Sequence, residues 1–205
     1  EAVAETNDDL ATKYLEGDQL SPEEVLSALK RSVLEGQIVP VIPGSATLSI
    51  GIKEVLEIIS NYMPSPVDVD PAIARGAGYD TEHALKLDQD GPLSVLVFKT
   101  TADPYVGKLS YFRVYSGSAH SDSQVWNVNK DQTERVGQLF VPRGKAQEQV
   151  SRLCAGDIGA VSKLSVTSTG DSLGQKEKPF VLDGISFPEP VFTVAVYPKT
   201  KADLD

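Results

Sequence analysis

One stretch decides the fold class of this chain, Pro104-Tyr-Val-Gly-Lys-Leu-Ser-Tyr-Phe-Arg-Val-Tyr-Ser-Gly117. From Lys108 to Tyr115, small or polar residues alternate with apolar ones, which is the pattern of a half-buried β-strand. A glycine stands before this strand and Ser116-Gly117 follow it, so the strand is expected to be short and to turn at both ends. Similar runs follow it, and their regular spacing predicts a small antiparallel β-barrel.

The other expected strands share branched or aromatic residues and are bounded by turn residues. Together with 108–115 they are 93–101, 124–128, 133–140, 157–163 and 192–197. Turns are expected at Ser116-Gly117-Ser118, Asn129-Lys130-Asp131 and Thr169-Gly170-Asp171. Residues 92–205 are therefore predicted to form a C-terminal β-barrel domain.

The N-terminal part has helical periodicity instead. Helices are expected over 2–15 and 50–63, and a third begins at Ser21-Pro22-Glu23-Glu24, which combines an N-cap serine with a proline in the first turn. The apolar run 38–42 predicts a buried strand. Residues 1–63 thus resemble the end of an α/β domain, and the fold class is α+β.

Residues 64–91 are expected to be a linker, because they contain prolines and glycines and no sustained period. The apolar faces within 38–63 lack the sheet that they would cover in a complete α/β domain. We therefore expect them to pack on each other, on the barrel or on a second copy of the chain, so that self-association is a possible outcome.

Charge is unevenly distributed along the chain. Residues 1–91 carry 6 Lys/Arg and 17 Asp/Glu, whereas residues 92–205 carry 13 and 12. Any contact with RNA is therefore expected from a local patch of the second part. The single cysteine, Cys154, fits a reducing compartment. The sequence contains no run of eighteen apolar residues, so no membrane-spanning helix is expected. A cytoplasmic location is expected, and the absence of an initiating Met suggests a piece of a longer protein.

Several segments resemble the elongation factor G family, in order and over nearly the whole chain. The resemblance to its second domain is carried by Phe98-Lys-Thr-Thr-Ala-Asp-Pro-Tyr-Val-Gly-Lys-Leu109, Arg113-Val-Tyr-Ser-Gly117, Ala155-Gly-Asp-Ile-Gly-Ala-Val161, Thr169-Gly-Asp-Ser-Leu173 and Pro188-Glu-Pro-Val191. Val196-Tyr-Pro-Lys-Thr-Lys-Ala-Asp203 resembles the passage to its third domain. Lys13-Tyr-Leu-Glu-Gly17 and Ile38-Val-Pro-Val-Ile-Pro-Gly-Ser-Ala46 are similar to the end of its G domain. The segments Val141-Pro-Arg-Gly-Lys145 and 73–87 differ from the usual sequence of the family, which indicates an elongation factor G-like paralogue.

The resemblance implies a parent protein that is a multidomain GTPase, binds GTP or GDP with Mg²⁺ and acts on the ribosome in translocation or a related step. It implies small-subunit ribosomal RNA as a partner of the barrel, with the remaining G domain and domain III as partners in the same chain. This chain lacks the motif Gly-x-x-x-x-Gly-Lys-Ser/Thr, so no catalytic residue, metal ligand or bound cofactor is expected in it.

The resemblance also implies individual site residues. Gly44-Ser45-Ala46 corresponds to the family tripeptide whose backbone N–H groups contact the guanine oxygen in the parent protein. Candidate phosphate contacts in the barrel are Lys108, Arg113, Arg143 and Lys145, although each could equally be a solvated cation, and Arg113 could form a structural ion pair. Trp126 is expected in the core or at its rim rather than as a base-stacking platform.

Two classes of function remain open at this point. In the first, the chain is the non-catalytic central part of a ribosomal GTPase. In the second, it is a stand-alone barrel that binds RNA or protein without nucleotide chemistry. A hydrolase is discounted because Ser116, Ser118, His120 and Asp122 all fall in one turn, whereas a catalytic triad is assembled from separated segments.

Overall fold

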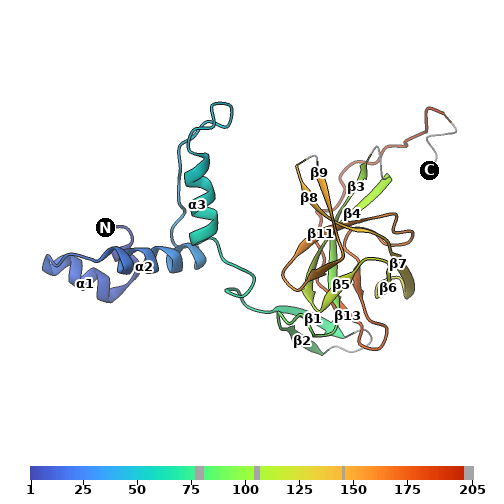
Figure 1. The fold of residues 1–205 in the computed structure, drawn as a ribbon, viewed down its shortest axis with the longest axis horizontal. Coiled ribbons are helices and arrows are strands. Elements are labelled where there is room, and N and C mark those ends of the chain that lie inside the picture. Colours follow the sequence, from blue (N-terminus) through green and yellow to red (C-terminus); the bar gives the residue numbers. More distant parts are fainter. Residues whose placement is uncertain (77–80, 104–106, 145, 201–205) are drawn as a thin grey trace. The chain divides into compact units, whose positions relative to one another are not determined.

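The computed structural model describes residues 1–76, 81–103, 107–144 and 146–200. The chain divides into two compact units, Glu1–Asp70 and Pro71–Asp205 (Figure 1). The first contains helices and the second contains antiparallel strands. The predicted α+β class, with helices preceding a curled antiparallel sheet, is confirmed.

The first unit contains a short 3-10 helix η1 (Ala4–Thr6) and three α-helices, α1 (Asp8–Glu16), α2 (Pro22–Leu34) and α3 (Ile52–Tyr62). Helix α1 begins where the Asn7 side chain accepts a hydrogen bond from the Leu10 N–H and ends at Gly17, whose φ of 85° suits a left-handed cap. The expected helix over 2–15 is therefore two pieces, because Asn7 interrupts it with extended backbone.

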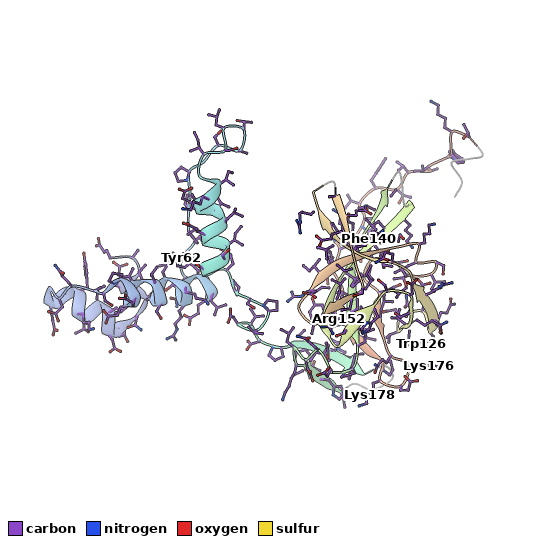
Figure 2. All side chains as sticks on the ribbon, viewed as in Figure 1. Tyr62, Trp126, Phe140, Arg152, Lys176 and Lys178 are labelled. Atoms are coloured by element: carbon purple, nitrogen blue, oxygen red, sulfur yellow. The ribbon has the colours of Figure 1, made fainter. Side chains whose placement is uncertain are left out.

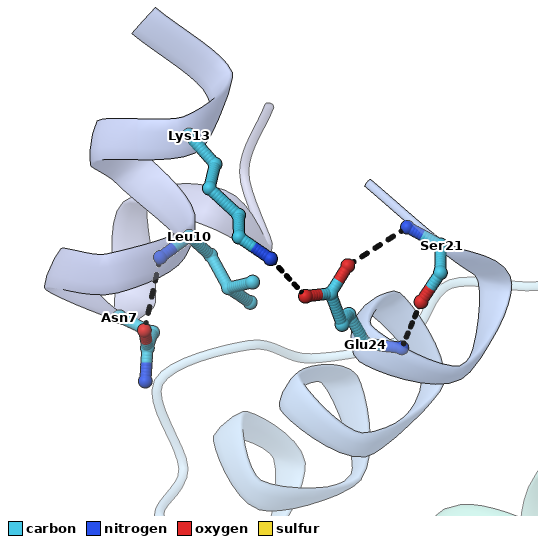
Figure 3. A network of polar contacts seen from close by, with 5 residues as sticks. All are labelled: Asn7, Leu10, Lys13, Ser21 and Glu24. Carbon is cyan, nitrogen blue, oxygen red and sulfur yellow. Dashed lines mark hydrogen bonds and ion pairs between the residues drawn. The ribbon is translucent and has the colours of Figure 1, made fainter. Parts of the chain in front are cut away.

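Helix α2 begins with a capping box (Figure 3). Ser21 Oγ accepts from the Glu24 N–H at 3.2 Å, and the Glu24 carboxylate accepts from the Ser21 N–H at 2.9 Å. Lys13 Nζ of α1 donates to the same carboxylate at 2.5 Å. These contacts, led by the hydrogen bond from Lys13, lower the pKa of Glu24 to about 2. Glu24 thus both caps α2 and joins it to α1.

Replacing Ser21 with Ala should destabilise α2 by about 1 kcal/mol, because the Glu24 N–H loses its acceptor. Urea unfolding followed by helical circular dichroism measures this loss. Ser27→Ala is the matched control, since Ser27 is an exposed serine within the same helix and Ala favours helix there. Equal stability of both variants would contradict the cap assignment.

The predicted strand over 38–42 is wrong. These residues form no regular secondary structure, and Val39 and Val41 are 78% and 88% exposed. Pro40 and Pro43 remove ladder donors, and the described part of this unit contains no sheet for the segment to join.

The apolar stripe of α3 is also exposed, and the expectation that the faces within 38–63 pack on each other is wrong. Ile52, Leu56 and Ile59 are 42%, 59% and 53% exposed. Helix α3 has no buried residue. The amphipathic pattern of α3 therefore predicts a helix, but it does not determine which surface buries the apolar face of that helix.

The second unit is built on one antiparallel sheet of eight strands that curls around a core (Figure 1). The strands are β3 (Ser94–Asp103), β4 (Gly107–Ser116), β6 (Ser123–Asn127), β7 (Gln132–Val136), β8 (Leu139–Arg143), β9 (Ala146–Val150), β11 (Ile158–Ser162) and β12 (Ser172–Gly174). Their order is β7-β6-β12-β3-β4-β11-β8-β9. Phe112 and Val114 of β4 enter the core, as the alternation from Lys108 to Tyr115 predicted.

A two-stranded ribbon, β5 (Ser118–His120) paired with β10 (Arg152–Cys154), adds Ala119 and Leu153 to the core. Ser121, which follows β5, links this ribbon to strands β8 and β9 at one edge of the main sheet. Its hydroxyl accepts from the Leu139 N–H at 3.0 Å and donates to the Val150 carbonyl at 2.8 Å.

A second sheet, of three strands, lies at the start and end of this unit. It consists of β1 (Ala72–Gly76), β2 (Glu82–Leu85) and β13 (Phe180–Leu182), in the order β13-β1-β2. Its residues Ala74, Leu85 and Leu182 form a separate small core with Leu96 of β3. The stretch 64–91, expected as a linker, therefore contains two strands.

The expected strand over 192–197 is wrong, because residues 183–200 carry no strand. Val191, Phe192 and Val196 are 100%, 80% and 87% exposed. The segment has strong strand propensity but no partner strand in the described chain, and a strand forms only by pairing.

Candidate functional site

The tripeptide Gly44-Ser45-Ala46 lies in a tight hairpin-like loop that leads into α3. The Ser45 N–H donates to the Ile50 carbonyl at 2.9 Å, and the Ile50 N–H returns a bond to Ser45 at 3.0 Å. A Cβ on Gly44 would lie 2.8 Å from the Ile50 oxygen, so the two sides of the loop require glycine to approach this closely. In this conformation the Ser45 N–H is already bonded within the loop, so this donor could contact a base only if its bond to Ile50 were released.

Lys108 at the start of β4 is held by the protein itself. Its Nζ donates to the Thr167 carbonyl at 2.6 Å, across 59 residues of sequence. The side chain is half-buried. Lys108 therefore connects the loop 163–171 to β4.

Arg113 lies on the outer face of β4. Its guanidinium carbon lies 5.0 Å from the ring centroid of Tyr115, which is a cation–π contact. Its Nε is buried and has no hydrogen-bond partner among the described residues. The alternative of a structural ion pair does not occur among the described residues, and Arg113 contacts the tyrosine ring instead.

Arg143 is the most exposed candidate, with a side chain that is 79% exposed. It ends β8 and pairs with Glu148 of β9 at 2.8 Å. Such a surface pair contributes little, about 0–1 kcal/mol, so a phosphate could replace the carboxylate. Lys145 lies outside the described residues. The structure thus separates Arg143, which is accessible, from Lys108 and Arg113, which have intramolecular roles.

A buried polar network fixes the loop 163–171, and the sequence patterns did not reveal it. Glu134 of β7 is 1% exposed. Its carboxylate accepts from the Ser165 hydroxyl at 2.7 Å and from the N–H groups of Ser165, Val166 and Thr167 at 3.1, 3.2 and 3.3 Å. Burial acts to raise the pKa of Glu134, but these hydrogen bonds outweigh it and lower the pKa below 4.5.

Asn127 of β6 extends this network. Its amide nitrogen donates to Thr167 Oγ1 and to Asp171 Oδ2, both at 3.0 Å, and its oxygen accepts from the Lys130 N–H at 2.9 Å. The predicted turn at Asn129-Lys130-Asp131 is confirmed, and Asn129 Oδ1 accepts from the Ser172 N–H at 2.7 Å. The side chains of Asn127 and Asn129 therefore fix this turn and connect it to β12.

Replacing Lys108 with Met should destabilise the second unit by about 1–2 kcal/mol, because the Thr167 carbonyl loses a charged donor. Binding to RNA should change little. Urea unfolding and an RNA-binding assay on the same variant check both parts. A Lys108→Met protein of unchanged stability that had lost RNA affinity would reverse the assignment.

A hollow of about 380 Å³ opens beside Trp126 of β6. Lys176 lies against this ring, with Nζ 4.7 Å from the ring centroid, and Figure 2 shows the two residues next to each other. Trp126 is half-buried and lies at the rim of the sheet, as expected from the sequence. The hollow was not predicted, because Lys176 lies fifty residues away in sequence.

Comparison with known proteins gives the family. Residues 92–176 match the family model described as elongation factor G domain 2. Residues 92–176 belong to the elongation factor G domain 2 family. The matched residues contain β3 to β12, and therefore the whole curled sheet of this elongation factor G domain.

A solved structure extends the similarity beyond this domain. The crystal structure of ttk003000868 from Thermus thermophilus is similar with a TM-score of 0.69 and 30% sequence identity. The alignment covers 98% of this chain and 28% of the Thermus chain. This chain therefore spans less than a third of the length of that relative. No helix among the residues that the structure describes is long and apolar enough to cross a membrane.

Proposed function

We propose that this chain is the non-catalytic central part of an elongation factor G-like GTPase. The parent protein binds the ribosome and couples GTP hydrolysis to translocation or a related step. In it, the curled sheet contacts small-subunit ribosomal RNA and the neighbouring domains. The place of action is the cytoplasm, where ribosomes work.

The observation that carries this proposal is the match of residues 92–176 to elongation factor G domain 2. The similarity over 98% of the chain to a much longer protein supports the view that the helical unit belongs to the same parent. GTP, GDP and Mg²⁺ are then ligands of the parent, and Gly44, Ser45 and Ala46 would line its base site, with the Ser45 N–H free to contact the base once its bond to Ile50 is released.

Among the basic candidates, Arg143 has the geometry that a phosphate contact needs. It is exposed, and its partner Glu148 is exposed as well, at 58%. Lys145 follows two residues later in the sequence and would add a second charge. Phosphate contacts of this kind fix the position of a protein on RNA without reading its sequence.

A competition experiment tests the proposal. The isolated chain should bind no guanine nucleotide by titration, yet an excess of it should slow the ribosome-stimulated GTP hydrolysis of the longer parent protein. Arg143→Glu should weaken this inhibition, and the exposed Lys53→Glu in α3 is the charge-matched control. Inhibition that is absent, or equal for both variants, would favour the alternative of a stand-alone binding module.

A further inference from the structure

The hollow beside Trp126 is formed by residues that leave an aromatic face uncovered. Trp126 pairs directly with Gly174 of β12 and with Thr133 of β7. Side chains of directly paired residues share a face of the sheet, so the glycine leaves the space beside the ring empty. A Cβ at Gly174 would lie 2.8 Å from the Leu93 carbonyl oxygen, so the close approach of backbone here requires glycine.

The group that lies over the Trp126 ring is the long, unbranched side chain of Lys176, with Nζ 4.7 Å from the ring centroid. Lys176 is exposed and belongs to the short turn closed by the bridge between Gln175 and Lys178. A lysine over a tryptophan face contributes about 0.5–1 kcal/mol at an exposed site, which a stacked planar ligand can replace. The displaced ammonium would remain beside the ligand and could pair with an anion.

The polar groups and the charge around the hollow narrow the ligand class. Gln124 and Thr133 line it with an amide and a hydroxyl that can bond the edge of a base. The hollow is also lined by His120, Lys176 and Glu177, and Lys178 lies next to Glu177 in the same turn. Two lysines beside one glutamate suit a single phosphate and disfavour a triphosphate. The volume of about 380 Å³ falls in the range of small-ligand sites.

We propose that this hollow binds one unpaired nucleotide, with its base stacked on Trp126 and its phosphate on Lys176. The nucleotide can come from an unpaired position of an RNA strand or from a free mononucleotide, since the two share this chemistry. The RNA source rests on the proposed ribosomal function, whereas the pocket itself does not.

The chain carries one tryptophan, so its fluorescence reports on this hollow alone. The full chain is titrated with a short single-stranded RNA, with AMP, and with an RNA hairpin of the same composition. Saturable quenching by the single strand or by AMP is expected and assigns the source, while the fully paired hairpin stem should quench far less. Lys176→Met should lower the slope of log affinity against log salt for the single strand by about 1.

Lys99→Met is the matched control, because Lys99 also covers an aromatic ring, that of Tyr111 at 5.9 Å, and does not line the hollow. Trp126→Leu should weaken the binding of labelled single-stranded RNA about fivefold or more, measured by anisotropy on protein with an unchanged far-ultraviolet spectrum. Three results would overturn the proposal. The first is the absence of saturable quenching, and the second is equal quenching by the hairpin and the single strand. The third is an equal change of the salt dependence of binding in Lys176→Met and Lys99→Met. Saturable quenching without inhibition of the parent GTPase would contradict the proposed ribosomal function but would still support the nucleotide pocket.

Discussion

Replacing Glu134 with Ala should destabilise the second unit by about 3–5 kcal/mol, among the largest effects of any single substitution in this chain. The carboxylate accepts from three backbone N–H groups and one hydroxyl in a site that is 1% exposed. Ala would leave these buried donors without an acceptor, and each orphaned group costs about 1–3 kcal/mol before relaxation. Urea unfolding followed by Trp126 fluorescence measures the loss.

Glu148→Ala is the control for this experiment, because the Glu148 carboxylate forms an exposed ion pair with Arg143 and, among the described residues, no other side-chain hydrogen bond or ion pair. It should change the free energy of unfolding by no more than about 0.5 kcal/mol. Glu134→Gln should fall between the two, since its amide oxygen still accepts hydrogen bonds while its NH₂ group faces donors. A Glu134→Ala protein as stable as Glu148→Ala would show that the loop 163–171 does not depend on this carboxylate.

The same carboxylate should make stability depend on pH. The pKa of Glu134 in the folded protein lies below its ordinary value of 4.5, because hydrogen bonds to the charged form outweigh burial. Its contribution is therefore fully present above about pH 4.5 and is lost as the pH falls through the lower folded value. Unfolding free energies between about pH 3 and 7 should fall more steeply in acid for the wild type than for Glu134→Gln. Parallel profiles would contradict the lowered pKa.

Gly117→Ala should cost about 3 kcal/mol or more, because backbone atoms block the added methyl group. Gly117 has a φ of 73°, and a Cβ there would lie 2.7 Å from Leu93 Cα and 2.8 Å from the Gly91 oxygen. These are backbone atoms of the segment that leads directly into β3, so relief would require this backbone to shift. Thermal unfolding of the variant measures the effect.

Gly137→Ala provides the comparison for this prediction. No atom lies within 4 Å of the position that a Cβ would take at Gly137, and its φ is outside the left-handed region. The substitution should therefore be neutral or slightly stabilising through the unfolded chain. Similar destabilisation by both substitutions would mean that the close approach to Leu93 does not govern the cost at Gly117.

Residue patterns predicted the long strands of the sheet and missed its short polar ones. The alternation in β4 follows directly from one buried face, and Ser21-Pro22 marks the start of α2. Strand β9 reads Ala-Gln-Glu-Gln-Val, which has no apolar alternation because both of its faces are largely exposed. The expected single strand over 133–140 is two strands, since Gly137-Gln138 breaks it between β7 and β8.

The functional residues were harder to predict because their partners lie far away in sequence. Glu134 stands two residues from Val136 and so shares its inward face, which is the one signal that could have identified it as buried. The bond from Lys108 to Thr167 and the contact of Lys176 with Trp126 depend on tertiary structure that local patterns do not encode. Residue type alone therefore could not show that Lys108 bonds to a backbone carbonyl whereas Arg143 is largely exposed.

Binding of the isolated chain to purified small ribosomal subunits tests the central claim most directly. We expect saturable cosedimentation that weakens as salt increases and that Arg143→Glu reduces more than Lys53→Glu does. Failure of the folded wild-type chain to cosediment at low salt, or binding that neither salt nor Arg143→Glu affects, would contradict the proposed contact with ribosomal RNA.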